Sequence, residues 1–310
     1  MYFPYLHARQ MELLALRDNS GQLAGWKTAP VLEPVKTGPR DLLRCLGELE
    51  RASAPCYVII NPHQGEFRHG VPHDWEREVN SLVATSKVIR PAFQVSRAST
   101  RAGLQAFLAM YAGRPVGVVV RTAEIPPVDM AADLAGSNAI VFLHARGNPR
   151  MYQQTLTGIT VEVEECFNAQ DRNADYNGAE WFTTSHLNYS GNGLPGFSDF
   201  GPLPPTFSLT GGQAAAVAIH LTYRNQADGS LWVEHFVSDS TDLGDGDRAS
   251  KTAEATAKVT SAVRADPTRF TRTAGLQAFL TQAANGTPTD LGTSKRQQLC
   301  HHLATVGPLV

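Results

Sequence analysis

The chain has 310 residues, of which 42% are hydrophobic and 18% are charged, so it can bury a sizeable core and is not intrinsically disordered. Lys and Arg number 27 against 29 Asp and Glu, which leaves a formal net charge of -2. This balance excludes a global basic field that would recruit nucleic acid or an anionic membrane.

The four cysteines are dispersed and form no CxxC pair, a pattern typical of reduced thiols rather than of a zinc ribbon or a disulfide framework. No stretch approaches the ~18 consecutive apolar residues of a membrane span. The N-terminal residues also lack the basic and apolar regions of a signal peptide. We therefore expect a cytoplasmic protein with no membrane partner.

Short apolar, β-branched runs alternate with amphipathic segments, which is the pattern of repeated βα units. The helices that the spacing predicts in the first half lie at 9–16, 41–49, 75–84 and 99–108. The predicted strands lie at 3–6, 29–35, 56–62, 88–95, 116–121, 139–144 and 159–164. The middle strands are apolar throughout, as expected of parallel strands covered on both faces.

An eighth strand, at 196–200 or at 216–221, would close these units into a barrel. The same rhythm also fits an open, doubly wound sheet. No GxGxxG or GxxxxGK[ST] motif follows any strand, so the nucleotide-binding form of that alternative has no support. The sequence therefore favours a single α/β domain over residues 1–310 with a (β/α)-barrel of the TIM type.

Three segments depart from the repeat. Residues 167–210 are rich in Gly, Asn, Pro and aromatic residues and predict a packed loop excursion, and residues 250–310 predict C-terminal helices. Residues 215–240 predict a β-hairpin around Asp228-Gly229, a pair that favours a two-residue type I′ turn. In that register His220 and His235 are diagonal neighbours on one face, which is either a binding site or simply a solvated face.

Polar side chains follow several of the predicted barrel strands. Because ligands meet the C-terminal ends of parallel strands, these residues are the first candidates for a site. They supply the carboxylate, imidazole and guanidinium groups that acid/base chemistry on a phosphate or carbonyl substrate requires. They are Glu33, Asn61, Arg121, His144, Arg146, Glu164 and Glu165.

Two further candidates lie in the irregular segment. Asp171 and Asp175 flank Arg172, and the two carboxylates would either coordinate a divalent cation or form a structural Asp/Arg lock. Asp199 lies between two aromatic residues, where burial would raise its pKa or an arginine would hold it ionised.

Several segments resemble a bacterial group related to the phage Beta-protein family, and the resemblance spans nearly the whole chain. The segments are 1–6, 12–16, 30–36, 60–62, 172–176, 196–199, 217–220, 235–239, 291–293 and 301–303. The resemblance implies a barrel protein encoded among mobile or phage-conflict genes. That family has no established reaction, so the resemblance names no substrate.

Two hypotheses follow. The first is a barrel hydrolase that acts on a phosphate or phosphodiester, with or without a divalent metal. Its acid/base groups would be Glu33, Asp199, His220 and His235, and its anion-binding groups would include Asn61, Arg121, His144, Arg146 and Arg172. The second is a non-catalytic binding or sensing module whose aromatic loop, residues 176–200, grips a protein or peptide partner.

Overall fold

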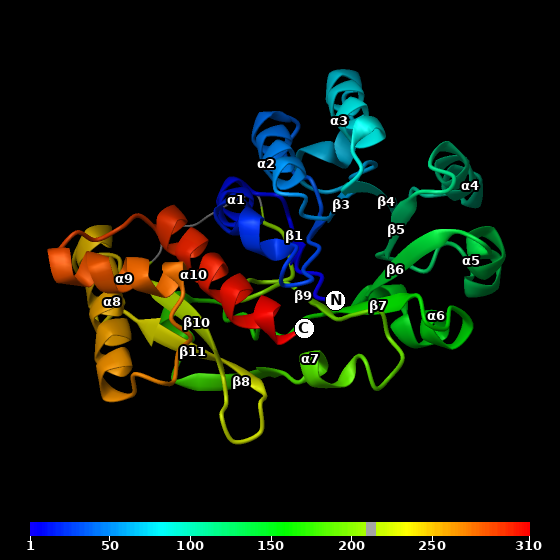
Figure 1. Ribbon diagram of the computed structural model, residues 1–310. Helices are drawn as coiled ribbons and strands as arrows, with labels where there is room; N and C mark the ends of the chain where they lie inside the picture. The colour runs from blue at the N-terminus through cyan, green and yellow to red at the C-terminus, as the bar shows by residue number, and fades with distance from the viewer. Residues whose placement is uncertain (209–214) are drawn as a thin grey trace.

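The computed structural model describes residues 1–208 and 215–310 and places a parallel β-barrel beside a smaller antiparallel sheet (Figure 1). The eight barrel strands pair in the order β1-β2-β3-β4-β5-β6-β7-β9. Their bounds are β1 Tyr5–Leu6, β2 Val31–Leu32, β3 Cys56–Ile59, β4 Ile89–Val95, β5 Pro115–Val120, β6 Asn138–His144, β7 Thr160–Glu164 and β9 Ser198–Asp199.

A parallel bridge between Tyr2 and Phe197 closes the barrel, and the Phe3 amide donates to the Phe197 carbonyl at 2.9 Å. The TIM-type prediction is therefore confirmed, and the first of the two candidate segments supplies the last strand. The second candidate segment instead belongs to the antiparallel sheet.

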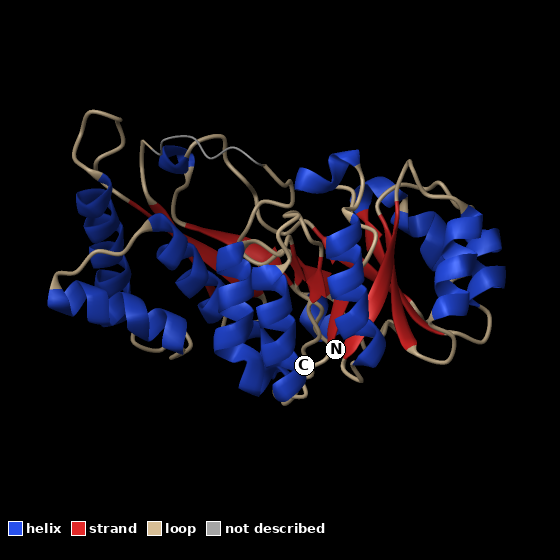
Figure 2. Cartoon of the chain, turned by 90° about the horizontal axis from the view of Figure 1, so that it is seen from above, coloured by secondary structure: helices blue, strands red, loops and turns tan. Residues whose placement is uncertain are grey.

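Helices follow the first six strands and lie outside the barrel wall (Figure 2). They are α1 Gln10–Leu23, α2 Arg40–Arg51, α3 His73–Thr85, α4 Arg101–Met110, α5 Pro127–Leu134 and α6 Pro149–Thr155. Short 3-10 turns occur at Gly65–His69, Ala145–Gly147, Asn173–Asp175 and Gly307–Leu309. None of the helices in the described ranges is both long enough and apolar enough to cross a bilayer.

The connection from β7 to β9 holds the 3-10 turn Asn173–Asp175, the strand β8 (Ala179–Thr183) and the short helix α7 (Ser185–Asn188). The C-terminal helix α10 (Leu291–Val306) lies beside α1, where Arg296 pairs with Asp18 at 2.6 Å. It thus covers the junction of β9 and β1 at the end of the chain, as the last helix of a regular barrel would.

A three-stranded antiparallel sheet lies beside the barrel, in the order β10-β11-β8. Strands β10 (Ala218–Arg224) and β11 (Leu231–Val237) form the predicted hairpin, and α8 (Arg248–Ala265) and α9 (Ala274–Asn285) pack on one face. The predicted loop excursion at 167–210 was therefore incomplete, because it contains β8. That strand is only five residues long and pairs with a segment far along the chain, so local periodicity does not reveal it.

The register of the hairpin shows that the predicted two-residue turn was wrong. His220 lies directly opposite His235, and the Asn225 amide donates to the Ser230 carbonyl at 2.8 Å, so the loop has four residues, 226–229. Asn225 Oδ1 accepts from the Ala227 amide, and Asp228 Oδ1 accepts from the Ser230 amide. These side-chain bonds support a wider loop than the Asp-Gly pair alone predicts.

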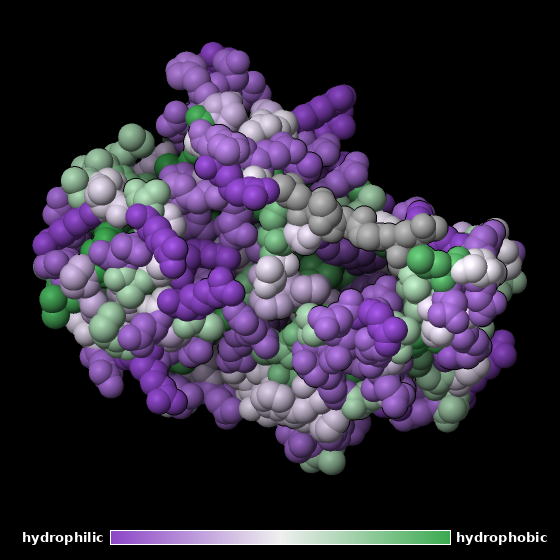
Figure 3. Space-filling model, turned by 180° about the vertical axis from the view of Figure 1, so that it is seen from behind, coloured by the Kyte–Doolittle hydropathy of each residue, from purple (hydrophilic) through white to green (hydrophobic). Residues whose placement is uncertain are grey.

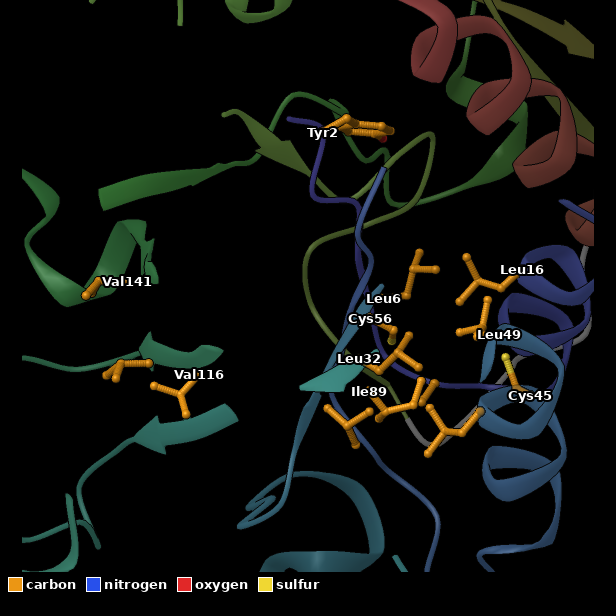
Figure 4. Close-up of a cluster of buried hydrophobic side chains, with 14 of the residues drawn as sticks. Tyr2, Leu6, Leu16, Leu32, Cys45, Leu49, Cys56, Ile89, Val116 and Val141 are labelled. Atoms are coloured by element: carbon orange, nitrogen blue, oxygen red, sulfur yellow. The ribbon is translucent and has the colours of Figure 1, made fainter. Parts of the chain in front are cut away.

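Two concentric apolar layers hold the barrel together. Side chains alternate along each strand, so Tyr5 points into the barrel while Leu6 points toward the helices. In the outer layer the strand residues Leu6, Leu32, Cys56 and Ile89 gather beside Leu16, Cys45 and Leu49 of α1 and α2 (Figure 4). The view from behind shows a largely hydrophilic surface with small, separate hydrophobic groups (Figure 3).

The inner layer is tightly filled by aromatic rings, among them Tyr57 and Phe142. Gly117 of β5 makes room for them, because a Cβ at this position would lie 3.0 Å from Tyr57 Cδ1 and 3.0 Å from the Ala92 Cβ. The barrel interior is therefore a packed core, and any ligand must bind at its end.

Candidate active site at the mouth of the barrel

Polar side chains cap the inner apolar layer at the C-terminal ends of the strands. Each lies two residues after an inward-facing core residue, and the two-residue period of a strand brings it inward as well. The set is His7 after Tyr5, Glu33 after Val31, Asn61 after Ile59, Gln94 after Ala92, Arg121 after Val119 and His144 after Phe142. Four of these, Glu33, Asn61, Arg121 and His144, were predicted from their positions at strand ends.

Glu33 is the centre of this group and is fully buried. Its Oε2 accepts hydrogen bonds from Tyr5 Oη at 2.6 Å and Arg121 Nη1 at 2.9 Å. Its Oε1 accepts from Gln64 Nε2 at 2.9 Å and Gln94 Nε2 at 2.8 Å. Four donors from four different segments therefore converge on one carboxylate.

The environment keeps Glu33 ionised. Burial alone would raise the pKa of its carboxyl, but the contacts with His7 and Arg121 outweigh burial and hold the pKa below its ordinary value. A carboxylate in this state does not donate a proton at neutral pH. Its role is to orient Arg121 and Tyr5.

Two histidines flank Glu33. His7 Nε2 lies 3.3 Å from the Pro205 carbonyl, which only accepts, so Nε2 carries a proton. His7 Nδ1 lies 3.6 Å from Glu33 Oε2 and makes no hydrogen bond within the described part of the chain. The next residue, Ala8, has a φ of 48°, a left-handed conformation unusual for alanine, at the turn that leads into α1.

His144 packs edge-on against Tyr5, with ring centroids 4.6 Å apart. Burial, together with the positive charge of Arg121, lowers the pKa of His144 to about 3, so its imidazole is neutral at physiological pH. Its Nε2 is buried and has no hydrogen-bond partner among residues 1–208 and 215–310.

Two more polar atoms of this region are buried without a hydrogen-bond partner in the described ranges. They are Gln94 Oε1 and His63 Nε2, and His63 is close enough to feel the charge of Glu33. An unpaired buried polar atom costs about 1–3 kcal/mol, and native structures contain few of them. Together with His7 and His144, these atoms make the mouth the candidate site.

Arg121 joins the buried group to solvent, because its side chain is 25% exposed while that of Glu33 is fully buried. A cavity of about 200 Å³ lies beside the mouth between β1, α1 and the segment after β9. Its lining combines aromatic rings with two cations and one carboxylate, and includes Tyr5, His7, Phe200, Phe207, Arg9, Lys295 and Glu12.

The remaining rim residues are less central. Asn61 bonds the backbone of Gln94 through both side-chain atoms, at 2.7 and 3.0 Å, and so ties the end of β3 to β4. Arg146 is exposed on the turn that follows β6. Glu164 points away from the barrel interior and accepts from the hydroxyls of Thr183 and Ser185.

Asp199 does not reach the mouth, which corrects the expectation of a common site. Its inward neighbour is Phe200, and Asp199 itself is buried on the outer side of β9. Its Oδ1 accepts from Tyr2 Oη at 2.8 Å and from the Gly201 amide at 2.7 Å, and it lies 3.4 Å from His302 Nε2. This network joins β9, the segment before β1 and α10.

His220 and His235 also lie outside the mouth. Their Nδ1 atoms are 2.7 Å apart, and His235 Nε2 lies 3.3 Å from Glu180 Oε1. The proximity was therefore correctly predicted, but the face is only partly exposed, because the rings of Phe167 and Tyr176 pack against both histidines. Burial, with a smaller effect of His235, lowers the pKa of His220 to about 3.

The polar segment at 171–175 is exposed and distant in sequence from every mouth residue. Arg172 donates to Asp175 at 3.0 Å through Nε, which is the Asp/Arg lock, while Asp171 is exposed. Across the described ranges, no group of three or more His, Cys, Asp or Glu side chains is arranged to hold a metal ion. A divalent metal at Asp171 and Asp175 stays a prediction.

No protein-family model matches the sequence, and a search of the curated proteins finds no similar chain. Among solved structures, the chain is similar to the spore cortex-lytic enzyme SleL of Bacillus cereus, with 9% sequence identity and a TM-score of 0.32. The alignment covers 97% of this chain and 74% of that chain. A similarity this weak supports no conclusion about activity, and the resemblance to the phage Beta-protein group stays a prediction.

Proposed function

We propose that the mouth of the barrel hydrolyses a phosphate monoester or phosphodiester. The observation that carries this proposal is a partly exposed arginine, Arg121, held by the ionised Glu33 beside the neutral and unpaired His144. A guanidinium fixed at a pocket entrance is suited to an anion with several oxygens, such as a phosphoryl group.

The cavity beside the mouth supports an organic phosphate. Arg9 and Lys295 add positive charge there, and the rings of Phe200 and Phe207 offer an apolar wall to the rest of the substrate. Lys295 pairs with the buried Glu12 at 3.1 Å, which holds the ammonium group at the cavity. Arg9 and Lys295 thus offer an anion positive charge from two segments of the chain, next to the carboxylate of Glu12.

His144 is the proposed general base. A water molecule attacks phosphorus, its proton passes to His144 Nε2, and the ester P–O bond breaks on the opposite side, where the leaving oxygen takes a proton from solvent. The unliganded pKa of about 3 makes His144 a weak base. A phosphate bound beside it would raise that pKa, because a negative charge favours the imidazolium form.

The test compares turnover of bis(p-nitrophenyl) phosphate and p-nitrophenyl phosphate, with p-nitrophenyl acetate as the non-phosphate control. His144→Gln should reduce phosphate turnover by about 100-fold or more, the usual contribution of a general base. His73→Gln is the matched control, because His73 is exposed at the start of α3. No turnover of either phosphate, or full activity in His144→Gln, would refute the proposal.

Titration with inorganic phosphate separates binding from catalysis. Arg121→Lys should weaken phosphate binding, whereas Arg150→Lys on the exposed side of α6 should not. Phosphate binding without turnover would favour a sensing module instead. In the form of that alternative in which the aromatic loop grips a partner, Trp181, which is 54% exposed, would make the contact, because Tyr176, Phe182, Phe197 and Phe200 are all at most 8% exposed.

A further inference from the structure

Three aromatic residues form a row across the antiparallel sheet, far from the mouth of the barrel. Tyr223 of β10 pairs with Trp232 of β11, and Trp232 pairs with Trp181 of β8. Residues directly opposite each other on antiparallel strands share one face of the sheet. Neighbouring strands lie about 4.8 Å apart, so this aromatic row extends over about 10 Å.

The face that carries the aromatic row is only partly covered. Helices α8 and α9 pack on its other end, over Ile219, Leu221 and Phe236. Tyr223 packs against this cluster, with its ring centroid 5.6 Å from that of Phe270, whereas Trp232 is partly buried and Trp181 on the edge strand is 54% exposed. Trp181 is contiguous with Trp232 and Tyr223 on this face, and a contiguous exposed apolar patch often marks an interaction site.

A cavity of about 380 Å³ opens at the row, between the hairpin loop and the connection from α8 to α9. Asn225, Gln226 and Thr268 contribute amide and hydroxyl groups to its wall. The cavity thus combines flat apolar rings with neutral hydrogen-bonding groups.

Two of the three rings, those of Trp232 and Tyr223, are held in place by their own polar atoms. Trp232 Nε1 donates to Ser230 Oγ at 2.8 Å, and Tyr223 Oη accepts from Arg269 Nη2 at 3.1 Å. The Arg269 guanidinium also lies 4.5 Å from the Tyr223 ring centroid and pairs with Glu234 at 3.1 Å. A ligand therefore meets rings that are already oriented, which lowers the entropy cost of binding.

The charges around the row balance. Arg224 and Arg269 line the cavity, but Asp266 lines it too, and Arg269 is paired with Glu234. Single-stranded nucleic acid also stacks on aromatic rings, but it requires a groove with excess positive charge. The balance here favours an uncharged ligand.

We propose that the aromatic row binds a neutral carbohydrate chain. A pyranose ring has an apolar C–H face that stacks on an indole or phenol ring and a rim of hydroxyls that suits amide and hydroxyl partners. The length of the row fits adjacent sugar units of an oligosaccharide better than a single sugar. The site is independent of the phosphate chemistry proposed for the mouth.

Affinity gel electrophoresis of the full-length chain tests the proposal. Native gels would contain barley β-glucan, arabinoxylan, galactomannan, hydroxyethyl cellulose or soluble starch. We expect at least one of these polysaccharides to retard the protein, and Trp181→Ala to weaken that retardation at least tenfold. Met110→Ala is the matched control, because Met110 is 70% exposed on α4, away from the sheet.

Several results would overturn the proposal. They are the absence of retardation by every polysaccharide in the panel, or equal retardation of wild type and Trp181→Ala. Trp181-dependent binding of a 20-residue oligothymidylate would identify a nucleic-acid surface instead. Trp181-dependent dimerisation in sedimentation runs without polysaccharide would identify a self-association surface. Trp181→Phe, which keeps an aromatic ring, should retain binding and so exclude a folding defect.

Discussion

Arg121 Nη1 lies 2.9 Å from Glu33 Oε2 across the mouth of the barrel, although 88 residues separate the two in the sequence. Their strands, β5 and β2, are not neighbours in the sheet. The bond therefore spans the barrel and fixes a layer of polar side chains over the apolar core.

Replacing Glu33 with Gln should destabilise the fold. The amide keeps the shape of the side chain but leaves Arg121 without its counter-charge, and breaking such a pair costs about 3 kcal/mol. Because the pKa of Glu33 lies below its ordinary value of 4.5, its contribution is complete above pH 4.5 and is lost as the pH falls further. In urea unfolding, the free energy of unfolding should thus be lower for Glu33→Gln than for wild type, and this difference should shrink below pH 4.5. A deficit independent of pH would contradict this account.

Replacing His220 with Phe should make stability less sensitive to acid. The pKa of His220 is lowered from 6.5 to about 3, so between these values the unfolded chain binds one more proton there than the folded chain. Wild type should lose about 1.4 kcal/mol per pH unit at this residue as the pH falls below 6.5. His220→Phe should show a correspondingly shallower slope of unfolding free energy against pH. The exposed His73→Phe should keep the wild-type slope.

The same substitution at two glycines should have opposite effects. Gly117→Ala places a methyl group against Tyr57 and Ala92 inside the barrel and should destabilise it by about 1–3 kcal/mol. Gly47→Ala lies within α2 with nothing within 4 Å, and should stabilise the protein by about 0.5–1 kcal/mol. Chemical denaturation measures the change in unfolding free energy of each variant. Equal changes in the two variants would show that the barrel interior is packed more loosely than described.

Asp199→Ala should affect folding rather than chemistry. It removes the shared acceptor of Tyr2 Oη and of the Gly201 amide in a buried network. Tyr2 Oη keeps its contact with His302 Nε2 at 2.9 Å, so the Gly201 amide is the donor left unpaired, at a cost of about 1–3 kcal/mol. Phosphate turnover per folded molecule should match wild type. A stable variant with no turnover would restore Asp199 to the catalytic group.

The strand-end rule predicted Glu33, Arg121 and His144 but overlooked His7, Gln94 and Gln64. His7 and Gln94 carry a readable signal, because each stands two residues after an apolar strand residue that points inward. Gln64 has no such signal, since it reaches Glu33 from a loop of irregular backbone. Asp199 was misplaced for the opposite reason, because its neighbour Phe200 takes the inward position.

The amino-acid sequence alone determined the repeated βα units but left a barrel and an open sheet as alternatives, because β-branched apolar runs at regular intervals are buried as parallel strands covered by helices in both. It also determined which strands end in polar groups. Tertiary structure decided which of those groups share a pocket and which are buried separately in the antiparallel sheet and beneath α10. The reason is that the inward or outward direction of a side chain depends on strand register and closure, which are set by pairing between segments far apart in the chain.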